Sequence, residues 1–355
     1  MNKHALKERF PEHLVVTDCA GRASVMVYVP KFYMDEVIKG APHLPHPAFV
    51  VDGNEIDGIY ISKFQNVLCE GLAYALPDED PATGVDFDTA VRACAEKGQG
   101  FHLMTAMEWG AIALWCQANG CLPYGNNDAG KDIREQRCVA SPTCVSNDPP
   151  IYRVATGTGP VTWSHNHRAD GIYDLNANVW EWCGGMRLVY GELQLLPNAL
   201  GNQAADASDW RAVDGTTGAL IPPNGMGTTK NSIKLDRIDD VWIYVTAPVT
   251  NADRHARFCA FDDVRAHESV CAAAKQLLYA LGILPVSGYT HPEVAFYANN
   301  GADERMVFRG GRWGQGLNAG VFKTCMDDPR SYAGPAVGFR AAYYDALEAS
   351  SQNGT

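Results

Sequence analysis

The chain has 355 residues, of which 46% are hydrophobic, 10% aromatic and 20% charged, and its formal net charge is -12 at pH 7. This composition is typical of a folded globular protein and excludes a disordered one. The acidic balance, without any cluster of Lys or Arg, excludes nucleic acid as a general partner, because a phosphate backbone is bound mainly by basic side chains.

The start of the chain, residues 1–10, is polar and lacks the hydrophobic core of a signal peptide. No apolar run in the sequence approaches the roughly 20 residues that a membrane-spanning helix needs. We therefore expect synthesis in the cytoplasm, without a signal peptide and without membrane insertion.

The first half of the chain carries both strand and helix signals. Residues 24–34 and 58–64 are rich in Val, Ile and Tyr and predict strands. A helix is predicted over residues 88–97, where apolar residues recur on one face. The next helix begins at a T-x-x-E capping box formed by Thr105 and Glu108, in which each side chain satisfies a backbone N–H of the first turn.

The second half contains long polar segments. Residues 121–160 and 198–231 are rich in Gly, Asn, Asp and Pro and predict irregular surface segments. A third helix is predicted over residues 263–281, and a final central strand over residues 337–342. The sequence therefore predicts an α+β protein with few helices, many short strands and much irregular loop.

The sequence contains 11 Cys, an odd number, and no C-x-x-C pair of the kind that binds zinc or performs redox chemistry. Several fall on apolar helix faces and are interpreted as small buried hydrophobic residues. Cys138 and Cys144 lie in a polar loop and could pair in an oxidising setting, whereas a cytosolic setting favours free thiols.

Three blocks in a fixed order carry a resemblance to a known family. The first is GFHLMTAMEW at residues 100–109, followed by CLPYGNN at 121–127; the second is DGIYDLNANVWEW at 170–182; the third is FRGG at 308–311, closing with VGFR at 337–340. The first two blocks resemble the R-L-P-T-E-A-E-W helix, the P-W-G-N turn and the G-L-Y-D-M-x-G-N-V-W-E-W segment of formylglycine-generating enzymes. Long stretches between the blocks match no motif.

The third block sharpens this resemblance. RGGRW at 309–313, GLNAGVF at 316–322 and VGFRA at 337–341 resemble the variable region of diversity-generating retroelement target proteins, and YISKFQN at 60–66 is similar to their N-terminal half. Those proteins have a C-type-lectin-like fold related to that of formylglycine-generating enzymes. The resemblance therefore implies an α+β, C-type-lectin-like fold of this type.

The resemblance also implies the domain organisation. We expect a single C-type-lectin-like domain over residues 1–345, with long loop insertions at about 121–160 and 190–262. A variable ligand-binding region is expected at about residues 309–340. Residues 346–355 are predicted to form a frayed tail.

The variable region implies a face whose side chains differ between copies of the gene. In retroelement targets, codons that contain adenine in a template are randomised on copying, and the altered positions cluster on one exposed face. The spacing from Gly311 to Gly338 places these positions at Arg312, Gly314, Gln315, Leu317, Lys323, Cys325, Asp327, Asp328, Tyr332, Gly334, Pro335 and Ala336. Four residues between them are expected to be fixed packing residues: Trp313, Ala319, Val321 and Phe322.

The resemblance implies a structural calcium (Ca2+) site in the W-E-W segment. Its ligands would be Asp174, Ala177, Val179 and Glu181, since carbonyl and carboxylate oxygens suit a hard cation. Ala177 stands where the family has Gly, which puts the loop geometry in question. A Glu between two Trp can equally bond backbone N–H groups or an Arg, so both interpretations of Glu181 remain open.

The resemblance leaves two functional classes, an enzyme and a binding protein. Formylglycine-generating enzymes oxidise a substrate cysteine with a copper-binding cysteine pair shortly after the Gly-Gly, whereas residues 312–320 contain no Cys and Cys325 stands alone. Related iron-dependent sulfoxide synthases use a helical H-x-x-x-H-x-E pattern, which is missing. We therefore expect no enzymatic activity and no organic cofactor, and keep a formylglycine-generating-type oxidase or iron-dependent oxidoreductase as the alternative.

The predicted function is recognition of a changing target by the variable face. The partner would be an unidentified protein or glycan on a host cell surface. The absence of a signal peptide favours display on a phage virion for host attachment, and a bacterial cytoplasm or cell surface is the alternative location.

Overall fold

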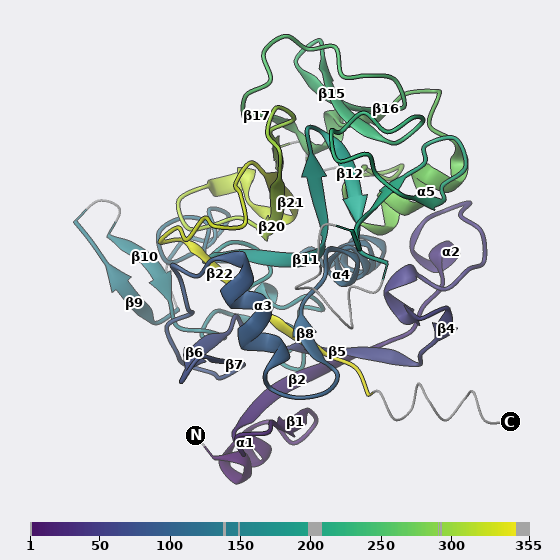
Figure 1. Cartoon of the computed structure of the whole chain (residues 1–355). Helices are drawn as coiled ribbons and strands as arrows, with labels where there is room; N and C mark the ends of the chain where they lie inside the picture. Colours follow the sequence, from purple (N-terminus) through teal and green to yellow (C-terminus); the bar gives the residue numbers. More distant parts are fainter. Residues whose placement is uncertain are drawn as a thin grey trace, which may run out of the picture.

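The computed structural model describes residues 2–137, 140–147, 150–197, 208–289, 291 and 293–345. Most of the described chain is strand and loop, with a few helices (Figure 1). The chain is therefore mixed α/β with short strands, few helices and long loops, as its sequence indicates. Within these described ranges, no helix has the length and apolar character needed to cross a membrane.

A five-stranded sheet joins the two ends of the described chain. Its strands run in the order β1-β2-β5-β23-β8. Their bounds are β1 Leu14–Thr17, β2 Ala23–Pro30, β5 Gly58–Ser62, β8 Phe101–Leu103 and β23 Ala341–Tyr343. The C-terminal strand β23 thus lies between two strands from the first third of the chain.

A larger, twelve-stranded sheet carries most of the second half of the chain. It follows the order β17-β19-β21-β20-β11-β12-β15-β16-β18, with β13, β14 and β22 attached beside this path. Its strands are β11 Trp180–Val189, β12 Glu192–Leu195, β13 Arg211–Val213, β14 Leu220–Ile221, β15 Lys234–Ile238, β16 Val241–Val245, β17 Arg257–Ala260, β18 Arg265–Ala266, β19 Ala295–Ala298, β20 Arg305–Gly310, β21 Gly320–Met326 and β22 Val337–Phe339. In Figure 1, β11 crosses the middle of the molecule, with β12, β15 and β16 above it.

Short two-stranded sheets and helices complete the structure. The small sheets pair β3 Val50–Val51 with β4 Asn54–Glu55, β6 Val67–Cys69 with β7 Leu72–Tyr74, and β9 Pro142–Val145 with β10 Ile151–Val154. The helices are α1 Lys3–Arg9, α2 Met34–Val37, α3 Phe87–Ala95, α4 Ala106–Ala118 and α5 Ala272–Ala280, with 3-10 turns η1 Pro47–Phe49, η2 Val161–Trp163, η3 Phe261–Asp263 and η4 Gly316–Asn318. The capping box predicted at the start of α4 is confirmed, since the Thr105 hydroxyl accepts from Glu108 N at 3.0 Å and Glu108 Oε2 accepts from Thr105 N at 2.8 Å.

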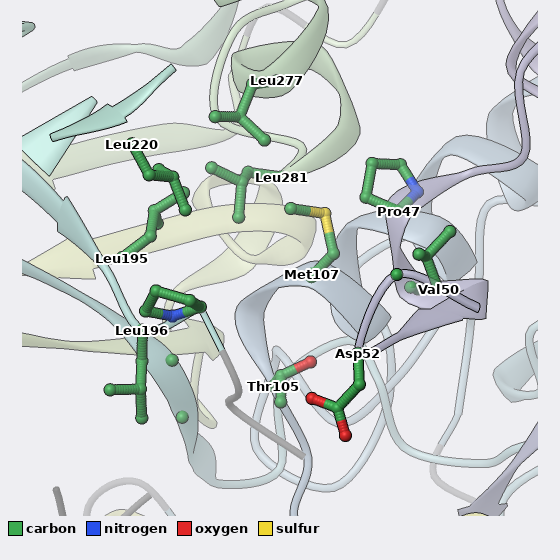
Figure 2. Close-up of a pocket in the computed structure, with 15 residues that line it drawn as sticks. Pro47, Val50, Asp52, Thr105, Met107, Leu195, Leu196, Leu220, Leu277 and Leu281 are labelled. Carbon is green, nitrogen blue, oxygen red and sulfur yellow. The ribbon is translucent and has the colours of Figure 1, made fainter. Parts of the chain in front are cut away.

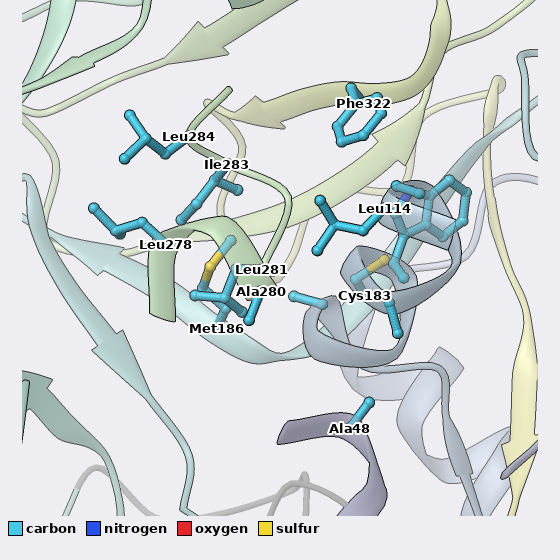
Figure 3. Packing of buried hydrophobic residues seen from close by; sticks show 14 of the residues in the cluster. Ala48, Leu114, Cys183, Met186, Leu278, Ala280, Leu281, Ile283, Leu284 and Phe322 are labelled. Carbon is cyan, nitrogen blue, oxygen red and sulfur yellow. The ribbon is translucent and has the colours of Figure 1, made fainter. Parts of the chain in front are cut away.

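Helices α4 and α5 pack on each other and on the large sheet to form the main core (Figure 3). Leu114 of α4, Leu278 of α5 and Phe322 of β21 are buried there together. A Cβ atom at Gly110 would lie 2.0 Å from Ala280 O, so only glycine allows the two helices to approach so closely. This core supports β20 and β21 from one side.

The chain passes from the large sheet to the small one at Arg340. Strand β22 pairs in parallel with β11, and β23 begins immediately after Arg340 and pairs with β5 and β8. The continuous strand predicted over residues 337–342 is therefore two short strands. The break has a physical reason, because the buried Arg340 guanidinium donates to the carbonyl oxygens of Ser62 and Tyr173.

One further expectation differs from the structure. The helix predicted over residues 263–281 is helical only in α5, because residues 265–266 form a strand paired with β16 and Cys271 caps the helix start. The segment 190–262 supplies the short strands β12 to β17 to the large sheet, and the other described residues between them are mostly irregular. The described residues of the segment 121–160 are irregular apart from β9 and β10, as expected.

Candidate ligand-binding site

The candidate site lies on the face of the large sheet that is turned away from α4 and α5. Side chains along β20 and β21 alternate between this face and the main core. The sheet register pairs Cys325 with Phe308 and with Tyr297, and it pairs Tyr297 with Phe258. Since paired residues share a face, these four side chains form one row across β20, β21, β19 and β17.

A pocket of about 200 Å³ opens on this row. It is lined by eight of the twelve predicted variable positions: Arg312, Gln315, Lys323, Cys325, Asp327, Asp328, Tyr332 and Ala336. The other lining residues are Trp180, Tyr297, Phe308 and Val337. Residues from a loop, a strand and a second loop thus converge on one cavity.

Four predicted positions lie outside this pocket. Gly314, Leu317 and Pro335 are exposed, and Leu317 lines a separate, smaller pocket. Gly334 is buried, and a Cβ atom there would lie 2.6 Å from carbon atoms of the Tyr332 ring. The structure therefore does not bring all twelve positions together.

Three of the twelve positions differ from the expected exposure. Lys323, Cys325 and Gly334 are buried rather than displayed. The reason is that the face is concave: Lys323 and Cys325 belong to the floor of the pocket and are shielded by the residues that form its rim.

A fixed frame holds the loop in front of the pocket. Gly310 and Gly311 adopt φ angles of 87° and 97°, and Cβ atoms there would lie 3.0 Å from Leu175 O and 2.8 Å from Ala319 Cβ. Arg309 is buried and donates to the carbonyl oxygens of Leu281 and Gly282, which follow α5, each at 3.1 Å. The four predicted packing residues are buried, as expected: Trp313, Ala319, Val321 and Phe322.

The floor of the pocket holds a buried ammonium group. Lys323 is 5% exposed, and its Nζ lies 5.3 Å from the centre of the Trp180 ring. Burial lowers the pKa of Lys323 to about 8, and the charge of neighbouring Arg312 acts in the same direction. In the part of the chain that the structure describes, no carboxylate pairs with either cation within 4.0 Å.

The opposite end of the pocket carries two neighbouring carboxylates. Asp327 Oδ1 accepts from Asn299 Nδ2 at 3.2 Å, whereas the Asp328 carboxylate has no ion-pair partner within the described ranges. Partial burial, followed by the charge of Asp327, raises the pKa of Asp328 to about 6. Lys323, Cys325 and Asp327 follow each other at alternate positions, about 7 Å apart along a strand, so the cationic and anionic ends are separated.

The fixed aromatic side of the site could not be predicted from local patterns. Phe258 is 61% exposed, and its ring stacks on Tyr297 with 6.3 Å between centroids. Trp180 and Phe308 meet edge-to-face at 4.9 Å in the pocket wall. In the sequence, Phe258 is only an apolar residue in a short segment. The pairing of β17 with β19 is what places it beside the pocket.

Cys325 is the cysteine of the pocket. Burial raises the pKa of its thiol well above the ordinary value, and the charges of Asp328 and Asp327 act in the same direction. A protonated thiol is a poor nucleophile and a poor metal ligand. Cys144 forms no disulfide with another described cysteine, and Cys138 lies outside the described residues, so their pairing stays a prediction.

The turn that was predicted to bind calcium does bring its four predicted ligands together. The Nε2 atom of Gln65 lies 3.0–3.2 Å from four oxygen atoms. These are the carbonyl oxygens of Asp174, Ala177 and Val179 and the Oε1 atom of Glu181. A calcium ion requires six to eight oxygen ligands at about 2.3–2.6 Å. As arranged, these residues do not fit the ion, because a hydrogen-bond donor lies between the oxygens.

The charge of Glu181 is balanced by arginine. Arg340 Nε donates to Glu181 Oε2 at 2.8 Å, and Arg340 Nη2 donates to Oε1 at 2.9 Å. Both side chains are buried. Of the two interpretations of Glu181 that the sequence leaves open, the structure contains the arginine pair.

A larger pocket, of about 310 Å³, lies between η1, α4, α5 and the end of β12 (Figure 2). Most of its side chains are apolar, with Asp52 at one side, and none of the predicted site residues lines it. A ligand site combines apolar walls with several convergent polar groups. The pocket of about 200 Å³ beside β20 and β21, with its aromatic row and four charged side chains, is therefore the better candidate.

No protein-family model and no curated protein sequence matches this chain. PvdO from Pseudomonas aeruginosa resembles it with a TM-score of 0.39 and 13% identity, covering 94% of this chain and 98% of that one. Treponema denticola variable protein 1 has a TM-score of 0.35 and 13% identity, covering 94% and 100%. The U1 variant of the Major Tropism Determinant has a TM-score of 0.29 and 11% identity, covering 90% of this chain and 56% of that one. All three TM-scores lie below 0.5, so the function is inferred from the pocket itself.

Proposed function

We propose that the chain is a non-catalytic ligand-binding protein and that the pocket beside β20 and β21 is its recognition site. In this proposal a diversity-generating retroelement exchanges the lining residues, and the target is a molecule on a host cell surface that is contacted during phage attachment. One observation carries the proposal. Eight residues chosen by sequence spacing line one cavity, while the four packing residues between them are buried.

The charges of the pocket indicate the chemistry of the ligand. Unpaired charges in a partly buried cavity are costly, and a ligand of complementary charge would remove that cost. Lys323 and Arg312 favour an anionic group at one end, whereas Asp327 and Asp328 favour a cationic group at the other. The aromatic wall favours a flat or apolar body between the two groups.

A set of three small probes tests this charge arrangement. The zwitterion 4-(aminomethyl)benzoate carries both charges on a flat ring, whereas 4-methylbenzoate and 4-methylbenzylamine each carry one. We expect the zwitterion to bind most tightly, with a Kd of about 1 mM for a ligand of this size. Titration followed by NMR shifts or tryptophan fluorescence measures the three affinities. Equal affinities would contradict the proposed charge arrangement.

The pH dependence of zwitterion binding sharpens this test. Asp328 gains its negative charge above about pH 6, and Lys323 loses its positive charge above about pH 8. Affinity should therefore be highest between these values and fall on both sides. Lys323→Met should remove the advantage of the zwitterion over the amine, whereas Leu317→Ala, outside the pocket, should leave the order of affinities unchanged.

The surrounding DNA tests the retroelement origin. A near-copy of the segment that encodes residues 309–340 should lie nearby, together with a reverse-transcriptase gene. The two copies should differ almost only at adenines of the template, in codons of the twelve predicted positions. A locus without the repeat and the reverse transcriptase would leave a binding protein with a fixed ligand.

The oxidase alternative is tested with a sulfatase-type C-x-P-x-R peptide and copper. We expect the peptide thiol to stay intact, because the Cys325 thiol is buried and its pKa is raised. Mass spectrometry of the peptide detects conversion. Turnover that is lost in Cys325→Ser would overturn the non-catalytic assignment.

A further inference from the structure

The backbone of the W-E-W turn aims several carbonyl oxygens at one point. Asp174, Ala177 and Asn178 adopt φ angles of 65°, 66° and 60°, a left-handed backbone conformation that residues other than glycine rarely take. This geometry turns the carbonyl groups of Asp174, Ala177 and Val179 inward, toward Gln65. Converging carbonyl oxygens repel each other unless a positive group lies between them.

The side-chain amide of Gln65 supplies the partial positive charge of its N–H groups at this point. Its Nε2 atom lies 3.1 Å from Asp174 O, 3.2 Å from Ala177 O and 3.0 Å from Val179 O. The same nitrogen lies 3.0 Å from Glu181 Oε1. The partial positive charge of the amide N–H groups is therefore shared among four oxygens in a fully buried place.

The orientation of the Gln65 amide is fixed by a chain of side-chain hydrogen bonds. Asn178 Nδ2 donates to Gln65 Oε1 at 2.9 Å. Asn178 Oδ1 accepts from Val154 N and from Asn126 Nδ2, both at 3.0 Å, so the Asn178 amide cannot be reversed without losing these bonds. The nitrogen of Gln65, and not its oxygen, must therefore face the four oxygens.

The charge of Glu181 is balanced, whereas the buried Asp174 carboxylate has no ion-pair partner among the described residues, and its Oδ1 atom has no hydrogen-bond partner there. Glu181 pairs through both oxygens with Arg340, as described above. Asp174 contributes its backbone oxygen to the group, and its carboxylate Oδ2 accepts from Gly157 N at 3.0 Å. A divalent cation at this point would have to displace the Gln65 side chain and compete with a buried guanidinium for Glu181.

We propose that the Gln65 amide takes the position of a cation in this turn and makes the fold independent of calcium. The neighbouring Lys63 acts in the same way on the start of the segment, since its Nζ donates to Ala169 O at 2.7 Å and Gly171 O at 2.8 Å. Two residues that follow β5 thus donate to six oxygen atoms of the segment 169–181. This role gives a structural meaning to the K-F-Q-N sequence at residues 63–66.

The first experiment uses the unmodified protein after treatment with a chelator. Thermal melting is compared in EGTA and in millimolar CaCl2. We expect the two melting temperatures to agree within about 1 °C, because no place for the ion is left. A rise of several degrees with calcium that disappears in Glu181→Gln would overturn the proposal.

A pair of variants tests the donor role of the amide. Gln65→Glu keeps the shape but replaces the N–H donors by a second oxygen, so at pH 8 a carboxylate would face four oxygens. Its melting temperature should lie far below that of the unmodified protein at pH 8 and recover partly at pH 5, where the introduced carboxyl group can take up a proton. The matched control Gln65→Met keeps most of the volume and has no charge, so its loss should be the same at both pH values. Equal losses for Gln65→Glu at the two pH values would contradict the donor role.

A third variant tests the position itself. Gln65→Ala leaves the four oxygens without a donor and opens space for an ion and its water ligands. Purified in the presence of calcium, this variant should bind radioactive calcium in equilibrium dialysis, and its melting temperature should rise with CaCl2. Failure of the folded variant to bind calcium would show that the amide does not stand at a cation position. Both results are independent of whether the pocket binds a ligand.

Discussion

The turn around Glu181 and the pocket around Lys323 both bury charged side chains, but they satisfy them differently. Arg340 is fully buried and donates to both Glu181 oxygens and to two backbone carbonyl oxygens. Lys323 is nearly as buried and has no ion-pair partner in the described part of the chain. A protein retains an uncompensated buried charge where binding, rather than stability, determines the residue. Under the proposed function, the Arg340–Glu181 pair holds the fold, whereas Lys323 is available to a ligand.

The largest effect is expected in the turn. Arg340→Met should lower the free energy of unfolding by about 3–5 kcal/mol, because it leaves Glu181 as an uncompensated buried charge. Chemical denaturation measures this loss. The double variant Arg340→Met with Glu181→Leu removes both charges and should recover much of the stability. A double variant no more stable than the single one would show that the lost backbone contacts of Arg340, and not the unpaired charge, dominate.

Part of this comparison could be predicted from the sequence, and part could not. Eight of the twelve positions placed by the spacing from Gly311 to Gly338 line one pocket. The concavity that buries Lys323 depends on Trp180 and Phe308, which lie in other strands. Gln65 donates to Glu181 across 116 positions, so no local spacing could join them.

The same distinction between local and distant signals applies to the fold. The Thr105 capping box was predicted correctly because all of its atoms lie within one helical turn. The helix predicted over residues 263–281 began too early, because apolar spacing does not reveal that residues 265–266 find a strand partner in β16. The strands within 190–262 were missed because they are only two to five residues long, too short for a clear alternation, although β15 and β16 form a local hairpin.

The second effect concerns Lys323 and has the opposite sign. Lys323→Met should stabilise the protein at pH 7, on the order of 2–3 kcal/mol, because the variant removes a buried ammonium group that lacks a carboxylate partner. Met is apolar and of similar length, so it can fill the same space beside Trp180. Chemical denaturation at pH 7 measures the gain. A loss of stability would mean that the contact with the Trp180 ring outweighs the desolvation of the charge.

The pH dependence of this gain follows from the lowered pKa. Below about pH 8 Lys323 is charged in both the folded and the unfolded state, so the folded state bears the full cost of burial. Between about pH 8 and the ordinary value of 10.5 the folded lysine loses its proton while the unfolded lysine keeps it, so the unmodified protein gains stability. The advantage of Lys323→Met should therefore shrink as the pH rises from 8 to 10. A constant advantage across this range would exclude desolvation as its cause.

The smallest effect is expected at the rim of the pocket. Substituting Arg312, Asp327 and Tyr332 by Ala together should lower the free energy of unfolding by only about 1 kcal/mol, because exposed and half-exposed side chains outside the core contribute little. Gln315 is left in place, since its Oε1 accepts from Arg312 N at 3.0 Å and holds the loop. The matched control Phe322→Ala, in the core beneath the same strand, should cost about 3–5 kcal/mol. The triple variant should at the same time lose the binding of the zwitterionic probe, which separates recognition from folding. If the triple variant and Phe322→Ala lose similar stability, the rim is part of the packed structure, and its residues cannot be freely exchanged as the proposed function requires.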